Sequence, residues 1–178
     1  MRKGNRRMGT ASMNVFEYKP IYRQQAIDLM AELQGSDREL SADRAQGRDM
    51  ADGHFEYLLD VCERQSGKVF VAVDEGDVQG VVLVFVEAEE EGDRHLLPEY
   101  RRYAWISDLV VAARGSDAAS WLMRAAERPS AAAGVTRIKL AALPGNSRAR
   151  HFYDKTGYAA YDVIYAKYIG DQGESHRS

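Results

Sequence analysis

The chain has 178 residues, of which 45% are apolar and 29% are charged, the composition of an ordinary globular domain. No apolar stretch reaches the roughly 18 residues that a membrane span needs, and the longest one covers residues 80–86. The single cysteine, Cys62, excludes an internal disulfide and a paired-cysteine zinc site. We therefore expect one cytoplasmic domain that has no membrane partner, with Cys62 as a small core residue.

The net charge of −3 is unevenly distributed. Residues 1–12 hold four basic residues and no acidic one, which leaves 20 basic against 27 acidic residues elsewhere, a net charge of −7. We predict that residues 1–12 form a disordered basic leader, with a basic arm for a phosphate-rich partner as the alternative. An acidic body is a poor partner for nucleic acid and a suitable one for cationic small molecules.

The first third of the chain predicts one strand and two helices. Residues 14–19 alternate in hydropathy, as a strand does, and residues 21–33 have apolar residues at helical spacing. Residues 35–52 are polar with mixed charges, so we expect a long loop or a short helix there. Residues 54–64 carry apolar residues on one face, which indicates an amphipathic helix.

The middle of the chain predicts an antiparallel hairpin. Residues 68–74 and 78–86 are β-branched and apolar runs, separated by the turn sequence Glu-Gly-Asp. Five acidic residues follow within residues 87–93. Residues 103–112 then predict a third buried strand.

The last third predicts alternating helices and strands. The expected helices are 118–133, which Pro129 should kink or split, and 147–156; the expected strands are 137–143 and 161–169. The element order predicts a mixed α/β sheet in one domain. The strand–loop–helix units in this part leave helix amides without internal partners, and such amides are ready anion sites.

Three stretches resemble the acyl-CoA-dependent N-acetyltransferases of the GNAT superfamily: ISDLVVA, RGSDAASWLMRAAE and AAGVTRIKLAALPGNSRARHFYDKTGY. The third follows the family spacing N-x-x-A-x-x-F-Y-x-K-x-G-[FY] through Asn146, Ala149, Phe152, Tyr153, Lys155, Gly157 and Tyr158. The resemblance is strongest over residues 69–158. It implies a GNAT-like domain over residues 13–169, a mostly antiparallel sheet with two splayed parallel strands flanked by helices, and a flexible tail at 170–178.

The resemblance also implies a site for acetyl-CoA, used as a co-substrate without a metal. The splayed strands would be residues 106–111 and 137–143, and the backbone of Leu109 and Val111 would hold the pantetheine and polarise the acetyl carbonyl. Asn146 would hydrogen-bond a pantetheine amide, and Tyr153 would protonate the departing thiolate. The amides that would take the diphosphate are those of Arg114, Gly115, Ser116, Asp117, Ala118 and Ala119. A core position beside Phe152 is the alternative for Tyr153.

One position departs from the family pattern. The phosphate loop is usually [QR]-x-x-G-x-[GA], and Asp117 replaces its middle glycine. At about 4 Å and an effective dielectric near 20, each like-charge contact with phosphate costs about 4 kcal/mol, so the Asp117 carboxylate must point away or weaken binding. Alternatively, this carboxylate caps the helix amides itself and occupies the site.

The implied reaction needs a carboxylate, or a water that it orders, to take a proton from the amine. Ser107-Asp108 stands where many relatives have Glu-Asp, so Asp108 is the first candidate and Glu87 the second. The alternative for Asp108 is a polar residue that completes a strand-end hydrogen bond. The four histidines have no metal-ligand spacing.

We therefore expect an N-acetyltransferase that acts by direct attack in a ternary complex on a primary amine of a small, cationic acceptor or a peptide. Residues 87–93 would border the acceptor entrance, or else form a solvated loop. The alternative function is a catalytically impaired GNAT-like binding or regulatory module. Homodimers are possible, with residues 161–169 as the pairing edge.

Overall fold

The computed structural model describes residues 13–92, 94–112, 117–167 and 169, and it divides the chain into two compact units at the Asn146–Ser147 bond. The predictions for the leader 1–12, for the tail 170–178 and for Arg114, Gly115 and Ser116 lie outside the described residues.

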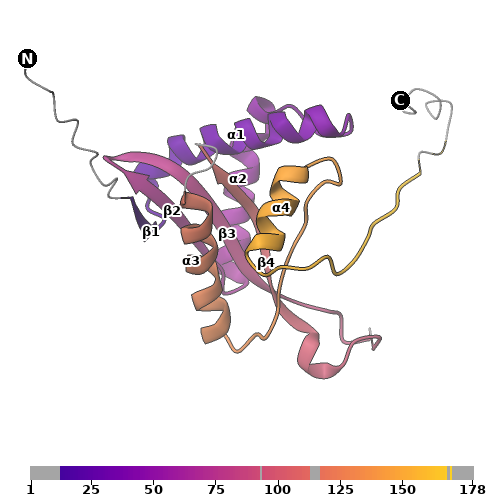
Figure 1. The fold of residues 1–178 in the computed structure, drawn as a ribbon. Coiled ribbons are helices and arrows are strands. Elements are labelled where there is room, and N and C mark those ends of the chain that lie inside the picture. Colours follow the sequence, from indigo (N-terminus) through magenta and orange to yellow (C-terminus); the bar gives the residue numbers. More distant parts are fainter. Residues whose placement is uncertain (1–12, 93, 113–116, 168, 170–178) are drawn as a thin grey trace, which may run out of the picture. The chain divides into compact units, whose positions relative to one another are not determined.

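The first unit contains a five-stranded sheet whose spatial order is the chain order (Figure 1). The strands are β1 (Asn14–Glu17), β2 (Lys68–Asp74), β3 (Asp77–Ala88), β4 (Arg102–Val111) and β5 (Ile138–Leu140). Neighbouring strands run antiparallel except for β4 and β5, which are parallel. This is the expected mixed α/β sheet.

Helices cover both faces of this sheet. The helices α1 (Arg23–Leu40) and α2 (Gly47–Arg64) share one core with the sheet residues Val71, Val81 and Leu83, all fully buried. The helix α3 (Ala118–Ala132) packs on the other face through Leu122 and lies in front of β3 in Figure 1. Short 3₁₀ turns precede α1 (η1, Pro20–Tyr22) and β4 (η2, Pro98–Tyr100).

The predicted hairpin is confirmed. β2 and β3 pair from Lys68↔Val84 to Asp74↔Asp77, and the turn between them uses positive φ at Glu75 (49°) and Gly76 (94°). Strand β3 extends to Ala88, so it includes the start of the acidic run. Cys62 lies in the core as expected, where burial raises the pKa of its thiol to about 11.

The expectation of a loop or a short helix over residues 35–52 is wrong. Helix α1 continues to Leu40 and α2 begins at Gly47, so residues 41–46 alone connect them. The helices approach so closely that a Cβ added to Gly47 would lie 2.0 Å from the Ala31 carbonyl oxygen, and Ala51 is 1% exposed. Of the polar residues that suggested a loop, Arg38, Glu39, Arg48 and Asp49 are exposed on these two helices, whereas Asp37 is partly buried.

Other boundaries differ from the sequence prediction in the last third. Helix α3 is not split at Pro129, which lies inside its last turn, and the helix continues to Ala132. Strand β5 has three residues instead of the seven expected.

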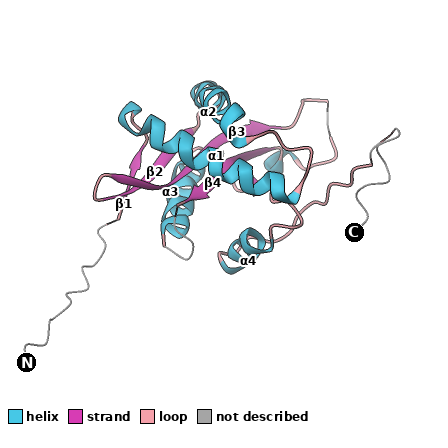
Figure 2. Ribbon diagram, turned by 90° about the horizontal axis from the view of Figure 1, so that it is seen from above, coloured by secondary structure: helices cyan, strands magenta, loops and turns pink. Residues whose placement is uncertain are grey.

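The second unit contains the predicted helix, α4 (Ser147–Lys155), and ends it at Gly157 with a φ of 92°. The prediction of a strand over 161–169 is wrong, because residues 161–167 and 169 form no strand and are drawn as loop in Figure 2. A strand needs a neighbour for its backbone groups, and no strand pairing among the described residues includes this segment. Its apolar side chains are exposed, at 88% for Ile164 and 91% for Tyr165.

Candidate active site

The parallel pair β4–β5 separates within the length of β4. Pairing runs from Ala104↔Ile138 to Ile106↔Leu140, where β5 ends, while β4 continues to Val111. Residues 107–111 therefore have a strand neighbour on their β3 side and an open edge on the other side within the described residues. This is the splay that the resemblance implied.

A β-bulge lies at the point where the strands separate. Val84 of β3 is opposite Ile106, and Leu83 is opposite Asp108, so Ser107 is the extra residue of β4. A bulge shifts the alternation of side chains by one position and re-aims the residues that follow it. Asp108 consequently shares the α1/α2 face of the sheet with Val110, a member of the core on that face.

The bulge also decides which backbone groups face the open edge. The Ala112 N–H donates to the Gln79 carbonyl of β3 at 2.9 Å. Backbone polar groups alternate between the two sides of a strand, so Leu109 and Val111 turn theirs away from β3. These are the two residues expected to hold the pantetheine, and their backbone orientation fits that role.

The Asp108 side chain is held by two polar neighbours. The Ser107 hydroxyl donates to Asp108 Oδ2 at 2.6 Å, and His54 Nε2 of α2 lies 3.5 Å from the same oxygen. The hydrogen bond to Asp108 raises the pKa of His54 against the opposing effect of burial. Asp108 thus interacts with two side chains, which differs from the alternative of a simple strand-end hydrogen bond.

A second carboxylate, Asp37 of α1, belongs to the same cluster. Burial is the main cause that raises the pKa of Asp37, and the charge of Asp108 adds to it while Arg44 opposes it. The sequence analysis missed Asp37 and did not assign a role to His54. Asp37 stood in the segment expected to be a loop, and no spacing rule connects His54 with a strand more than 50 residues later.

The start of α3 is described from Asp117 onwards. Asp117 is the N-cap residue, is exposed, and makes no side-chain hydrogen bond to the helix amides, so the alternative in which it caps them is not observed. Ala118 is fully buried, and its side chain at the start of the helix is only a methyl group. Uncapped amides and small residues fit a diphosphate, whereas the Asp117 charge opposes one.

The other candidate base, Glu87, lies in a different cluster. Tyr103 faces it across the β3–β4 pair and donates its hydroxyl to Glu87 Oε2 at 3.0 Å. Burial, followed by Glu87, raises the pKa of Tyr103 to about 12. Glu87 is four residues along β3 from Leu83, the partner of Asp108, a separation of about 13 Å at strand rise.

Glu89, near the start of the acidic run, forms an ion pair with Lys139. Lys139 Nζ lies 3.3 Å from Glu89 Oε1 and 3.7 Å from the centre of the Tyr103 ring. These contacts favour a structural role for the beginning of the run, and Asp93 lies outside the described residues.

The remaining expected site residues belong to the end of the first unit and to the second. The Asn146 N–H donates to the Leu143 carbonyl at 2.9 Å and closes the turn after β5. Tyr153 lies on α4, with the Phe152 ring at 5.6 Å and the Tyr158 ring at 6.2 Å. Tyr153 is described within its own unit, so its role as an acid stays a prediction.

The described part of the chain has neither a membrane-spanning helix nor a cluster of metal ligands. No helix there is long and apolar enough to cross a membrane. No group of three or more His, Cys, Asp or Glu side chains there could hold a metal ion.

Comparison with known proteins connects this arrangement to one family. The sequence profile of the Acetyltransferase (GNAT) family matches residues 27–158. The chain belongs to the GNAT acetyltransferase family. No curated protein sequence matches the chain significantly.

Solved structures share the fold at low sequence identity. A mutant of the BH1408 protein from Bacillus halodurans gives a TM-score of 0.73 at 19% identity, covering 88% of this chain and 99% of that one. An acetyltransferase from Trypanosoma brucei gives 0.62 at 16%, covering 88% and 99%. The aminoglycoside N-acetyltransferase AAC(6')-Iy in complex with CoA gives 0.62 at 14%, covering 89% and 95%.

Proposed function

We propose that this protein is an N-acetyltransferase that transfers an acetyl group from acetyl-CoA to a primary amine of a small, cationic acceptor by direct attack in a ternary complex. The observation that carries the proposal is the open edge of β4 at residues 107–111, with the Asp108 carboxylate beside it. When bound, acetyl-CoA supplies the thioester carbonyl that an amine can attack.

Residues of this chain hold the pantetheine, the thioester and the diphosphate of that co-substrate. The backbone groups of Leu109 and Val111 extend the sheet along the pantetheine and polarise the carbonyl. Asn146 hydrogen-bonds a pantetheine amide, and Tyr153 gives its proton to the leaving thiolate. The start of α3, from Asp117 to Ala119, takes the diphosphate together with Arg114, Gly115 and Ser116, which lie outside the described residues.

A cationic acceptor is supported by the carboxylates on the α1/α2 face. Asp37 and Asp108 come from different elements. Burial is the main cause that raises the pKa of Asp37, the Arg44 charge opposes it, and the Asp108 charge adds to it. The negative charge of these carboxylates attracts a cationic acceptor. By contrast, Glu87 and Glu89 are already engaged by Tyr103 and Lys139.

The test combines acetyl-CoA binding with an acceptor screen. Calorimetry measures binding, and free-thiol release with mass spectrometry of the product measures transfer to spermidine, kanamycin and a lysine-containing peptide. We expect binding, and transfer that falls about 10²-fold or more in Asp108→Asn. The matched control is Asp77→Asn at the start of β3, which should transfer at the rate of the unaltered protein. Absence of both binding and transfer would contradict the proposal.

A non-catalytic binding or regulatory module is the alternative, and the Asp117 charge is the observation that favours it. The two functions separate in a thermal-shift measurement, since acetyl-CoA at 100 times its Kd stabilises the fold by about 2.7 kcal/mol. If Asp117 is the obstacle, Asp117→Gly should bind acetyl-CoA more tightly than the unaltered protein.

The segment after α4 supports self-association. Val163, Ile164 and Tyr165 expose 65%, 88% and 91% of their surface, and neighbouring exposed apolar residues are a feature of interaction surfaces. A homodimer would cover this segment. Sedimentation equilibrium should give twice the monomer mass for the unaltered protein and a mass closer to that of the monomer for Ile164→Glu. The buried, unpaired Cys62 supports a reducing cytoplasmic location.

A further inference from the structure

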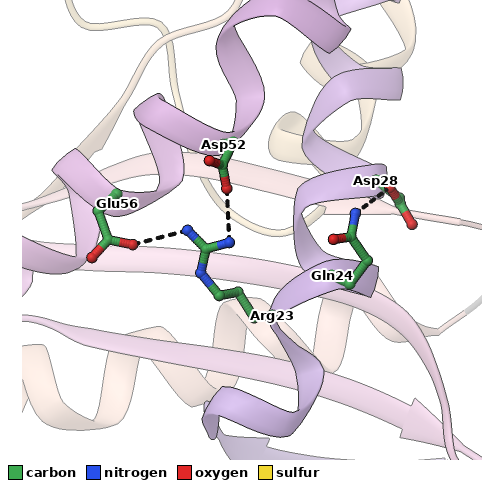
Figure 3. Close-up of polar contacts among 5 residues, drawn as sticks. All are labelled: Arg23, Gln24, Asp28, Asp52 and Glu56. Carbon is green, nitrogen blue, oxygen red and sulfur yellow. Dashed lines mark hydrogen bonds and ion pairs between the residues drawn. The ribbon is translucent and has the colours of Figure 1, made fainter.

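The side chain of His54 is fixed in place beside Asp108 by the packing of α2. Asp52 and Glu56 lie one turn apart on α2 and bind the two guanidinium nitrogens of Arg23 from α1, at 2.7 and 3.0 Å (Figure 3). His54 is two residues from each, so it projects from the opposite side of the helix. At the start of α2, the close contact of Gly47 with Ala31 of α1 also sets the position of α2 against α1.

His54 contacts groups from two elements, strand β4 and its own helix α2. From β4, Asp108 faces its Nε2 at 3.5 Å, and Ser107 donates to the same carboxylate. From α2 itself, the Tyr57 ring stacks on the imidazole at 6.4 Å. On α1, burial raises the pKa of Asp37, Arg44 in the connector opposes this effect, and the Asp108 charge adds to it.

The arrangement leaves one imidazole nitrogen available for chemistry. Because Nε2 faces a carboxylate, the neutral ring keeps its proton there and presents the Nδ1 lone pair. The His54 side chain is 33% exposed and Asp108 is 15% exposed, so the imidazole is the more accessible member of the pair. Asp108 immediately precedes Leu109, whose backbone faces the open edge.

We propose that His54 is a catalytic residue whose Nδ1 takes a proton from the acceptor ammonium, while Asp108 orients the ring and stabilises the imidazolium. This inference rests on the proposed acetyl transfer and specifies which group receives the proton. It extends the role expected for Asp108, which acts through His54.

The acceptor ammonium carries three protons, and two of them leave during the transfer. One proton moves to His54 Nδ1, and the uncovered nitrogen lone pair forms the C–N bond to the acetyl carbon. The C–S bond breaks, and its electron pair leaves on sulfur, which gains a proton from Tyr153. The amide nitrogen loses a second proton, which restores Tyr153 through solvent, and it keeps the third. His54 returns its proton to bulk water.

A pH profile tests this role directly, because neutral His54 is the reactive form. In the unaltered protein kcat/KM should rise with pH through the pKa of His54. In Asp108→Asn that rising limb should move to lower pH and the plateau should fall, since the carboxylate that raises the pKa of His54 is gone. An NMR titration of the His54 ring should give the same downward shift independently of turnover.

The decisive variant is His54→Gln. Its amide can still donate to Asp108 from the position of Nε2, but it cannot accept a proton, so it separates a structural contact from proton transfer. We expect a fall in kcat of about 10²-fold or more, loss of the rising limb, and unchanged acetyl-CoA affinity. The control is His95→Gln, which replaces an exposed histidine between β3 and β4. This variant should keep the kcat and the rising pH limb of the unaltered protein.

Every outcome decides a question. If His54→Gln keeps the kcat and pH limb of the unaltered protein, or if the His54 pKa is the same in Asp108→Asn, the inference is overturned while the acetyltransferase stands. If the unaltered protein binds acetyl-CoA without transferring to any acceptor of the screen, the proposed function fails and the inference with it. Partial rescue of His54→Ala by added imidazole would support the proton-transfer role.

Discussion

Two carboxylate clusters lie on the same pair of strands, and they differ in what their charges contact. At one end of β3–β4, Glu87 accepts from Tyr103 and Glu89 pairs with Lys139. Further along, Asp108 shares its oxygen with Ser107 and His54, and its charge reaches Asp37. The first cluster has a lysine and a phenol, while the second has a histidine whose pKa is raised by its hydrogen bond to Asp108.

This difference separates charge density from reactivity. Five acids in seven residues are the most conspicuous charged feature of the sequence, yet its first members form structural contacts. The cluster that can take part in the reaction contains one acidic residue of β4, Asp108. A bulge places it at the point where β5 ends. A titratable partner and an open strand edge define the candidate site.

Exchanging charge for amide in each cluster should give the largest contrast. Asp108→Asn should lower kcat/KM for acetyl transfer by about 10²- to 10⁴-fold, because it removes the carboxylate that orients His54 and stabilises its protonated form. Glu87→Gln should lower it less than tenfold. Steady-state kinetics of thiol release measures both, and a larger loss in Glu87→Gln would reverse the assignment of the two clusters.

A matched pair of tyrosine variants sharpens the same contrast. Tyr153→Phe should reduce kcat about 10²-fold and leave acetyl-CoA affinity unchanged, since it removes a proton donor. Tyr103→Phe should instead cost about 1 kcal/mol of unfolding free energy by removing the bond to Glu87, with kcat preserved. Equal kcat for Tyr153→Phe and the unaltered protein would remove Tyr153 from the mechanism.

The helix that carries His54 depends on the close approach at Gly47. Gly47→Ala places a methyl group 2.0 Å from a backbone oxygen of α1, so the helices must separate. We expect a loss of about 1–3 kcal/mol in urea unfolding, together with reduced transfer. Gly53→Ala is the control, because a Cβ there meets nothing within 4 Å. Similar stability for both variants would contradict the close packing.

The smallest expected effect is on the pH dependence of stability. Because Asp108 raises the pKa of His54, the pair stabilises the fold at pH values below the unfolded pKa, near 6.5, and this contribution is lost as pH rises through the folded pKa. With both groups partly exposed, the contribution is below about 1 kcal/mol. Between pH 5.5 and pH 8.5, the free energy of unfolding in urea should decrease less in Asp108→Asn than in the unaltered protein. An equal decrease in the two proteins would contradict the pairing.

The sequence predicted the local features that depend on neighbouring residues. The β2–β3 hairpin follows from two β-branched runs around Glu75 and Gly76, and α4 follows from its apolar spacing and Gly157. The family motif correctly indicated the splay beside Leu109 and Val111. These features are encoded within short windows of sequence.

The features that the sequence did not predict depend on distant partners. The polar residues 35–40 are helical because α1 packs on α2 through Gly47, which composition alone does not show. The alternating residues 161–169 suggested a strand, but alternation does not supply a partner. The approach of His54 to Asp108 arises from a helix crossing and a bulge, neither of which has a linear signature.

The most direct test of the central claim is amide hydrogen exchange of β4 with and without acetyl-CoA. If the open edge is the binding site, the amides of Leu109 and Val111 should become protected when acetyl-CoA is bound, while exchange at Glu87 and Tyr103 should stay unchanged. Binding that leaves Leu109 and Val111 unprotected would contradict the site, and absence of binding would contradict the proposed function.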